Sequence, residues 1–589
     1  QLFTTEEVFE NASSLTLIFY KMKNAQSRLR IYSIKFGYGL LYYNDSVISS
    51  SLESYVSPIC ADIPQIDFSV QLKNYDKYFN VDNPKSAINF LETGQEMEIY
   101  YGYELPETGK IEWIKGGKLL CSDWESDDYT ATIRCQDVFR NMDTEYYKGV
   151  YSDVGKSYFN LAKEILADAG ITDYYIDPLL KKLYTQNPMP RVTHKEALQI
   201  IANACRCVLS QSRNGTIQIK ASFSPDITLS SNGETTYSKL NNIINSSVKD
   251  EYASLSANYT TVNEKMYFLP RSSGNYLNTG YISLMQSDEN GEFDINPEIT
   301  IALETTYSYY SASFVFGGSI PAKFIIRTYN NNELVSEYEI TEGISRNLTV
   351  SYDFQDFDTM KIEFVKTVEP FNHIVLNNFS FGDITNFTMT RMDMTSSPKA
   401  IKQELIKEVI VPSYSYQKGN NEETLLNEEI TVTSGEEKTY FFSDPSYNFR
   451  ALIDNASTNV SIKSWGNYYI TLKFGATGTF NLEILGYKYQ IAEQNFIKPL
   501  NDNGKSVKWE NPLISNTSMA NDLAEWLGKY YTSKAEYEYS TRGNPEMDVN
   551  DLIYQENEFY KDMIVNVYRQ TLNFNQSFSG QVTTRRIGE

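Results

Sequence analysis

Histidine is almost absent from this sequence: its 589 residues include only His194 and His373. A serine or cysteine nucleophile normally needs a histidine base, so any catalytic triad would have to use one of these two residues. Neither has a second histidine or a cysteine at zinc-ligand spacing, and the HExxH and CxxC patterns are missing. His194 falls at the start of a predicted helix and His373 beside a predicted strand, so we expect structural roles for both.

Cysteine is scarce, and long apolar runs are missing. The five cysteines are odd in number and lie in apolar segments, which favours free, buried thiols over disulfides. No run of about 18 apolar residues predicts a membrane-spanning helix, and the N-terminal residues lack the pattern of a secretory signal. We therefore expect a protein made in a reducing cytoplasm, with neither metal nor cofactor. The cysteines are Cys60, Cys121, Cys135, Cys205 and Cys207.

Positive charge is in deficit. The chain has 52 Lys+Arg against 75 Asp+Glu, a net charge of −23, with a pI near 4.7. This balance argues against sequence-independent binding to the phosphate backbone of a nucleic acid. An acidic surface would let DNA pass along it without sticking, although the same acidity also keeps any large protein soluble.

Motifs for phosphate, calcium and hydrolytic chemistry are incomplete. The stretch from Gly149 to Gly155-Lys-Ser157 has five residues between its glycines where a phosphate loop has four, so a loop feeding a helix is the better interpretation. Asp288 begins an acidic turn, but the twelfth position of a calcium loop counted from it is Ile299. Carboxylate pairs always occur among 75 acids and carry no information. The sequence predicts a protein that is not an enzyme, and no catalytic residue is assigned.

Apolar and aromatic residues, by contrast, are plentiful. Apolar residues make up 41% of the chain, with 46 Tyr and 31 Phe, so we expect a fully folded chain of several domains. Up to about residue 146 apolar and polar residues alternate, as in the run Ile66, Phe68 and Val70, which predicts half-buried β-strands.

The period then changes to that of helices. One helix is predicted to begin near Ser157 and to end at Gly170, a residue suited to a left-handed cap. A second should open at Thr193, where Glu196 completes a capping box, and extend its inward face as far as Val208.

The fold class that follows is multidomain and mainly β, with a small α/β domain and an inserted β-sandwich of jelly-roll-like texture. The expected domains are 1–146, mainly β; 147–255, small α/β; 256–385, the inserted sandwich; 386–504, mainly β; and 505–589, a helix at 518–531 followed by β structure. In the insertion, Tyr307, Tyr309 and Tyr310 are candidates for stacking on a sugar, although aromatic residues in strands more often pack in a core.

Several stretches, taken in order, resemble the hub or baseplate proteins of tailed phages and prophages of Gram-positive bacteria, a family related in fold to the trimeric hub of contractile tails. Each stretch is weak alone, and the resemblance lies in their order; residues 260–385 have no counterpart in it. The stretches are Tyr75–Pro84, Leu91–Gln95, Tyr101-Gly102, Glu112-Trp113, Gly116-Gly117, Asp123-Trp124, Cys135–Asp137, Glu196–Asn203, Arg213–Gly215, Arg542–Pro545, Asp548, Asp551, Ser579-Gly580 and Arg585-Arg586.

The resemblance implies a homotrimer whose tail-tube-like β domains form a ring at the tip of the tail, in the virion, after synthesis in the bacterial cytoplasm. The implied neighbours are the tail tube or distal tail protein, the tape measure protein, and a tip spike or fibre. DNA would pass through without specific binding, and the insertion would be free to contact host cell-wall glycan. The alternative is a carbohydrate-binding adhesion or receptor-binding protein.

The resemblance also singles out residues expected to fix turns rather than to bind a ligand. Gly543-Asn544-Pro545 should make a rigid bend before the last strands. The candidates are Asp123, Trp124, Gly543, Asn544, Pro545 and Asp548.

Overall fold

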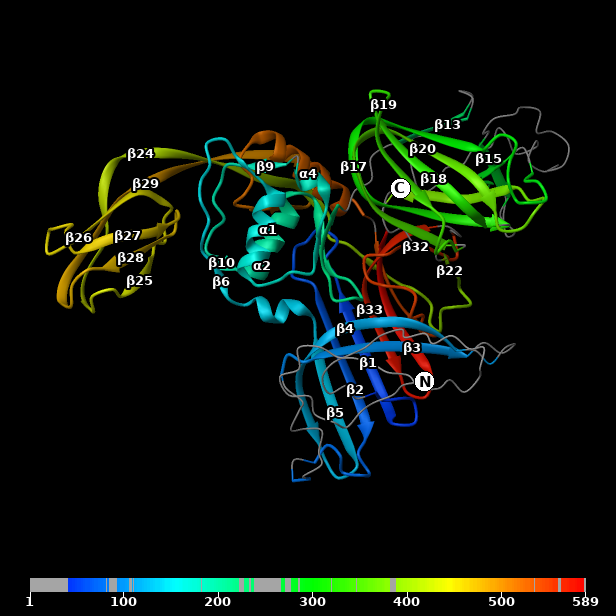
Figure 1. Ribbon diagram of the computed structural model, residues 1–589, viewed down its shortest axis with the longest axis horizontal. Helices are drawn as coiled ribbons and strands as arrows, with labels where there is room; N and C mark the ends of the chain where they lie inside the picture. Colours follow the sequence, from blue (N-terminus) through cyan, green and yellow to red (C-terminus); the bar gives the residue numbers. More distant parts are fainter. Residues whose placement is uncertain are drawn as a thin grey trace, which may run out of the picture. The chain divides into compact units, whose positions relative to one another are not determined.

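The computed structural model is mainly β, with three α-helices among the described residues (Figure 1). Residues 47–589 form one compact unit. The described residues are 41–80, 82–83, 93–104, 109, 111–181, 183–221, 227–231, 235–237, 266–270, 277–283, 286–318, 320–345, 347–381, 388–533, 535–559 and 563–586.

Strands from the beginning and the end of this unit form one eleven-stranded sheet, called here the composite sheet. Its order is β23-β31-β34-β33-β1-β2-β5-β4-β3, with β32 also on β33 and β22 on β32. Strands β1 and β33 join the two parts in antiparallel register, with Leu52 opposite Leu572. The strands are β1 Val47–Tyr55, β2 Gln65–Lys73, β3 Glu96–Glu104, β4 Ile111–Ser126, β5 Thr130–Gln136, β22 Thr388–Met389, β23 Lys399–Lys402, β31 Ala535–Thr541, β32 Leu552–Gln555, β33 Met563–Phe574 and β34 Phe578–Arg586.

The alternation of apolar and polar residues in the sequence explains which side chains are buried in the first strands of this sheet. Phe68, Val70 and Leu72 are buried, and the residues between them lie closer to solvent. The predicted β structure is therefore confirmed for the described part of the first region, and residues 1–40 lie outside the described residues. The pairing of β1 with β33 has no local sequence signal, and the expected domain boundaries stay predictions.

Three helices and a small sheet form what we call the α/β body. Helices α1 (Tyr158–Asp168), α2 (His194–Ala204) and α4 (Thr517–Tyr531) share one apolar core with the sheet β11-β12-β8. Its short elements are β6 Glu145–Tyr146, β7 Lys156–Ser157, β8 Tyr174–Ile176, β9 Tyr184–Thr185, β10 Val192–Thr193, β11 Cys207–Gln211, β12 Ile217–Ala221, and the 3₁₀ turns Val138–Met142 and Pro178–Lys181.

The predicted helix signals act as expected, with one correction. Ser157 caps α1, Gly170 has φ +73, and Thr193 and Glu196 form the predicted capping box. Helix α2 nevertheless ends before Val208, which lies in β11, because Arg206 at φ +58 turns the chain out of the helix.

The inserted β-sandwich is present. Its longest strands, β17 and β20, have 21 residues each and shift register along their length. Phe314, Phe316 and Phe324 lie in its core. The strands are β13 Ile227–Ser231, β14 Thr235–Tyr237, β15 Met266–Pro270, β16 Leu277–Ile282, β17 Glu298–Gly318, β18 Pro321–Asn330, β19 Glu333–Ile340, β20 Asn347–Thr367 and β21 Ile374–Phe381.

A long two-stranded ribbon carries a second small β module. Figure 1 shows β24 and β29 running side by side, and their pairing extends from Glu408 opposite Pro499 to Val432 opposite Gly478. The module has its own core, which includes Ile470, Leu472 and Leu482. The strands are β24 Ile406–Val432, β25 Glu437–Phe441, β26 Ser446–Ile453, β27 Val460–Trp465, β28 Tyr469–Phe474, β29 Gly478–Pro499 and β30 Lys505–Lys508.

Candidate functional site: the Arg213 junction

The side chain of Arg213 joins the α/β body to the composite sheet. Arg213 lies in the turn between β11 and β12, and its Nε donates to Asp548 Oδ2 at 2.9 Å. Its two terminal nitrogens donate to three backbone carbonyl oxygens, of Lys115 at 3.2 Å, Met547 at 3.0 Å and Glu546 at 3.3 Å. A guanidinium can hold all four contacts at once because its donors form a planar fork.

The segment that receives Arg213 turns at Gly543. Gly543 has φ +82, and a Cβ there would lie 3.0 Å from side-chain atoms of both Leu572 and Phe578. The side chain of Asn544 accepts from the backbone N–H of Glu546 at 2.8 Å. Asx turns of this kind pre-organise a loop without help from other elements.

A small cavity lies beside the arginine. It has a volume of about 10 Å³, and Tyr101, Arg213, Pro545 and Asp548 are among the residues that line it. This volume matches a single water molecule, so the cavity admits no substrate. Burial raises the pKa of the Tyr101 hydroxyl, and that hydroxyl has no hydrogen-bond partner among the described residues.

Glycine at position 116 is required by the same packing. A Cβ on Gly116 would lie 2.5 Å from Cε2 of Tyr101. The ring of Tyr101 is held between this glycine and Phe578, whose ring centroid is 5.4 Å away in an edge contact. Only a glycine at position 116 leaves room for the tyrosine ring.

The junction brings together segments that are far apart in the sequence. Four stretches of the phage-hub resemblance meet here: Tyr101-Gly102, Gly116-Gly117, Arg213–Gly215 and Arg542–Pro545, with Asp548. Sequence reasoning selected these stretches separately and missed that they are neighbours. The pairing of Arg213 with Asp548 crosses 335 positions, so no local pattern could have indicated it.

Asp123 and Trp124 lie elsewhere, on β4. Asp123 pairs with Arg134 at 3.1 Å on an exposed face, and Arg134 also contacts Glu125. Trp124 is half-buried and stands opposite Ile133 in the sheet. These contacts are cross-strand pairs of an ordinary sheet, and neither residue contributes to the junction.

Another stretch of the resemblance, Cys135–Asp137, ends on a buried carboxyl group. Asp137 accepts from the backbone N–H of Ile66 at 2.7 Å and of Phe139 at 3.0 Å. Burial raises its pKa to about 6, against the opposing effect of these donors. Asp137 thus connects the start of β2 to the 3₁₀ turn that leads into the α/β body.

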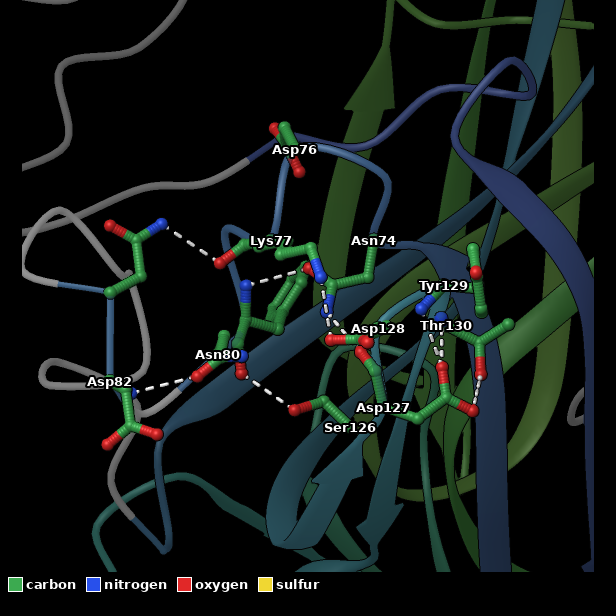
Figure 2. Close-up of polar contacts among 12 residues, drawn as sticks. Asn74, Asp76, Lys77, Asn80, Asp82, Ser126, Asp127, Asp128, Tyr129 and Thr130 are labelled. Carbon is green, nitrogen blue, oxygen red and sulfur yellow. Dashed lines mark hydrogen bonds and ion pairs between the residues drawn. The ribbon is translucent and has the colours of Figure 1, made fainter.

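The stretch Tyr75–Pro84, described here as far as Asn83 except for residue 81, forms a loop fastened to the β4–β5 turn, as Figure 2 shows. Asn74 is fully buried; its side chain accepts from Phe79 N at 2.9 Å and donates to the Asp127 carbonyl at 2.7 Å. Lys77, at φ +58, pairs with Asp128 at 2.7 Å. The backbone is therefore held on both sides of the loop.

The proposed sugar-stacking tyrosines remain untested. Tyr307, Tyr309 and Tyr310 belong to β17, and in its backbone register Tyr307 is opposite Phe357 and Tyr309 is opposite Phe354. Their side chains lie outside the described part of the structure.

Both histidines have structural contacts. His194 is buried, with Nδ1 2.6 Å from the Thr144 carbonyl oxygen and Nε2 3.1 Å from Asp168. Nδ1 of His373 lies 2.6 Å from the Ser283 carbonyl oxygen. All five cysteines are free and buried, as expected.

The incomplete motifs resolve into caps and turns. Ser157 caps a helix, and Asp288 accepts from the N–H groups of Asn290 and Glu292, each at 2.8 Å. Within the described residues, no group of three or more His, Cys, Asp and Glu side chains is placed to hold a metal ion. No helix in that part of the chain is long and apolar enough to span a membrane.

A larger hollow of about 320 Å³ lies beside the start of α4. Its one acidic side chain, Glu493, is 3.0 Å from Lys508. The hollow therefore offers hydroxyl and amide groups and one carboxylate that is paired with a lysine. It is lined by Ser413, Ser415, Ala492, Glu493, Gln494, Ser515, Asn516 and Thr517.

No protein-family model and no curated protein matches the sequence. Among solved structures, a tail protein from Neisseria meningitidis MC58 is 7% identical, covering 92% of this chain and 92% of that one, at a TM-score of 0.35. The 43 kDa tail protein of prophage MuSo2 from Shewanella oneidensis is 7% identical, covering 91% and 94%, at 0.34. The module CBM32-2 of a GH31 protein, bound to GalNAc, is 13% identical, covering 27% of this chain and 99% of its own, at 0.17. TM-scores below 0.5 do not establish a shared fold, so the function is argued from the residues of this chain.

Proposed function

We propose that this chain is a structural, non-enzymatic component of a phage-type tail, a hub or baseplate protein at the tail tip. Three copies would form a ring that continues the tail tube and surrounds the path of the DNA. The ring would bind the tail tube or distal tail protein on one side and a tip spike or fibre on the other, with the tape measure protein ending at it.

The observation that carries this proposal is the convergence at the Arg213 junction. Four stretches of the hub resemblance were selected from the sequence without knowledge of their positions, and they meet around one arginine and one water-sized cavity. Their convergence supports a shared architecture in which one junction couples the α/β body to the β domains.

The free end of the composite sheet supports assembly with further copies. Among the described strands β3 is last on its side of the sheet, and the solvent face of the β3–β4 hairpin carries Tyr100, Ile111 and Trp113, which are 48%, 45% and 55% exposed. The Trp113 ring lies over Gly102, where a Cβ would be 2.7 Å from it. Large exposed apolar groups beside an open strand edge are typical of a surface that another chain covers.

Charge supports the role of a conduit. The net charge of −23 would repel the DNA backbone, as a channel that must release DNA requires. The guanidinium of Arg213 is bonded to one carboxylate and three carbonyl groups of the same chain. These contacts within the fold occupy the arginine, so it does not serve as a binding site for the DNA backbone.

The first test is the molar mass of the purified full chain by light scattering at several concentrations, with negative-stain imaging of the same sample. A trimer of about 203 kDa, three times the 67.6 kDa of one chain, with an open centre is expected. A chain that stays monomeric up to the highest concentration, alone and with tail-tube protein added, would refute the hub proposal.

A matched pair of variants examines the hairpin face. Trp113→Glu should shift the chain toward the monomer, because a charge on this face cannot be buried against a neighbour without a partner. Trp465→Glu alters a tryptophan of similar exposure, 50%, in the small module of the β24–β29 ribbon and should leave the molar mass unchanged. Equal behaviour of the two variants would exclude the hairpin face as the interface.

A further inference from the structure

The turn between β20 and β21, at one end of the inserted sandwich, displays an aromatic ring on an unfavourable backbone. Phe371 is 62% exposed and has φ +55. A bulky residue with a positive φ is a genuine outlier, and such conformations persist only where the surrounding structure enforces them. The turn therefore maintains a conformation that exposes an apolar side chain.

A buried hydroxyl pair enforces this conformation. Ser287 and Thr367 are 2% and 1% exposed, and their hydroxyl groups are 2.7 Å apart. The Thr367 hydroxyl donates to the Glu369 carbonyl at 2.8 Å, and the Ser287 hydroxyl accepts from the backbone N–H of Asn372 at 3.1 Å. The backbone is thus held on both sides of residue 371.

Phe371 itself is fastened to the neighbouring acidic turn. Its backbone N–H donates to the Asp288 carbonyl at 3.2 Å. The ring is consequently presented from a rigid support, and a ligand that stacks on it would lose little entropy in ordering the turn.

Polar side chains belong to the same turn as Phe371 and to the acidic turn that accepts its backbone N–H. The Asn372 amide donates to the Glu369 carboxylate at 3.3 Å, and Asp288 accepts from two backbone N–H groups. The N–H groups of Glu292 and then Asn290 hold the pKa of Asp288 below its usual value, so this carboxylate is ionised at neutral pH. Lys366, at the end of β20, is paired with Glu292 at 3.6 Å.

This combination fits a sugar better than a protein surface. A stable protein interface covers about 800 Å² on each partner and uses clustered apolar anchors. One flat ring, in a turn that also carries carboxylate and amide groups, instead matches the size of one pyranose, whose C–H face is apolar and whose rim carries hydroxyl donors. The carboxylates would repel an anionic polymer.

We propose that the Phe371 turn, made of residues 368–372 and Asp288, binds a neutral glycan. Phe371 stacks on the apolar face of a pyranose ring. Asp288 and Glu369 accept hydrogen bonds from its hydroxyl groups, and Asn372 can donate one. This site differs from the Tyr307, Tyr309 and Tyr310 candidates, and it goes beyond the assembly role proposed above without depending on it.

The test is affinity electrophoresis of the full chain in gels that contain one polysaccharide each. The neutral probes are dextran, galactomannan and a β-glucan, together with neutral polysaccharide from bacterial cell walls; the anionic probe is alginate. We expect at least one neutral polysaccharide to retard the protein in a saturable way and alginate to have no effect. Absence of retardation by every neutral probe overturns the proposal.

Variants locate the site. Phe371→Ala should weaken retardation at least tenfold, and Phe371→Trp should keep it within about threefold because it retains a stacking surface. Phe559→Ala removes a ring that is 85% exposed elsewhere in the chain and should change nothing. The proposal is overturned if Phe371→Ala is retarded as strongly as the unmodified chain. It is also overturned if this substitution weakens the binding of a protein and leaves the binding of every glycan unchanged.

The molar mass of each sample separates this proposal from the hub proposal. Phe371→Ala should assemble as the unmodified chain does, because the turn is not part of the composite sheet. Hydrogen exchange over residues 286–292 confirms that the support beneath the turn is intact. If the chain assembles into a trimer but binds no neutral glycan, only the glycan site is overturned. If the chain stays monomeric but binds glycan through Phe371, only the hub proposal is overturned.

Discussion

Replacing Arg213 by alanine should release residues 543–551 from the α/β body. The substitution removes four hydrogen bonds at once: one to Asp548 and three to backbone carbonyl oxygens. It also leaves the Asp548 carboxylate without its cation. Arg213→Lys keeps the charge, but an ammonium group is a single point and cannot bond to all four acceptors.

The size of the effect follows from exposure. A hydrogen bond to a charged group contributes about 1.5–3 kcal/mol when buried. The Arg213 and Asp548 side chains are 24% and 38% exposed, so water can replace part of each contact. We therefore expect a local loss of about 2–3 kcal/mol for Arg213→Ala and about half of that for Arg213→Lys.

Hydrogen exchange is the suitable assay, because a chain of several modules does not unfold in one step and a single melting temperature would mix their contributions. A local loss of 2–3 kcal/mol corresponds to about 30- to 150-fold faster exchange in residues 543–551. Peptides from the small module, such as 469–474, serve as an internal control. Unchanged exchange in 543–551 would refute the idea that Arg213 holds this bend.

Three further predictions concern other positions. Gly543→Ala should speed hydrogen exchange around position 543 more than Gly94→Ala speeds it around position 94, because both residues have positive φ but only the Cβ at 543 meets neighbours within 4 Å; equal increases would contradict this. Asn467→Ala should cost about 2–4 kcal/mol locally and speed exchange at Tyr151, whose N–H donates to the Asn467 side chain; slow exchange retained there would count against it. Burial raises the Asp137 pKa from 3.8 to about 6, so the folded state binds the proton of this carboxyl group more tightly than the unfolded chain does. Protonated Asp137 therefore adds up to about 3 kcal/mol to the free energy of unfolding below about pH 4, and this stabilisation is lost as the pH rises to about 6. A carboxyl carbon titration by NMR with a midpoint near 4 would contradict that assignment.

The parts of this fold that sequence patterns predicted are those decided within a few neighbouring residues. A capping box needs only Thr193 and Glu196, and a half-buried strand needs only alternation such as Phe68, Val70 and Leu72. The end of α2 was placed too late because a positive φ at Arg206 has no local signature, since arginine is not a residue that favours it. Apolar periodicity that continues into a following strand does not reveal such a turn.

The junction and the Phe371 turn were out of reach for a different reason. Arg213 and Asp548 acquire a role only because β1 pairs with β33, a contact between the first strand of the unit and the last but one. Tyr307, Tyr309 and Tyr310 stand out in the sequence as an aromatic cluster, whereas Phe371 is a single phenylalanine after a proline. Its exposure and its φ of +55 distinguish it, and the two hydroxyl groups that hold its turn, those of Ser287 and Thr367, come from positions 80 residues apart in the sequence. A ring displayed at such a conformational cost is a stronger functional indicator than a run of aromatic residues in a strand, because packing alone explains the run and does not explain the strain.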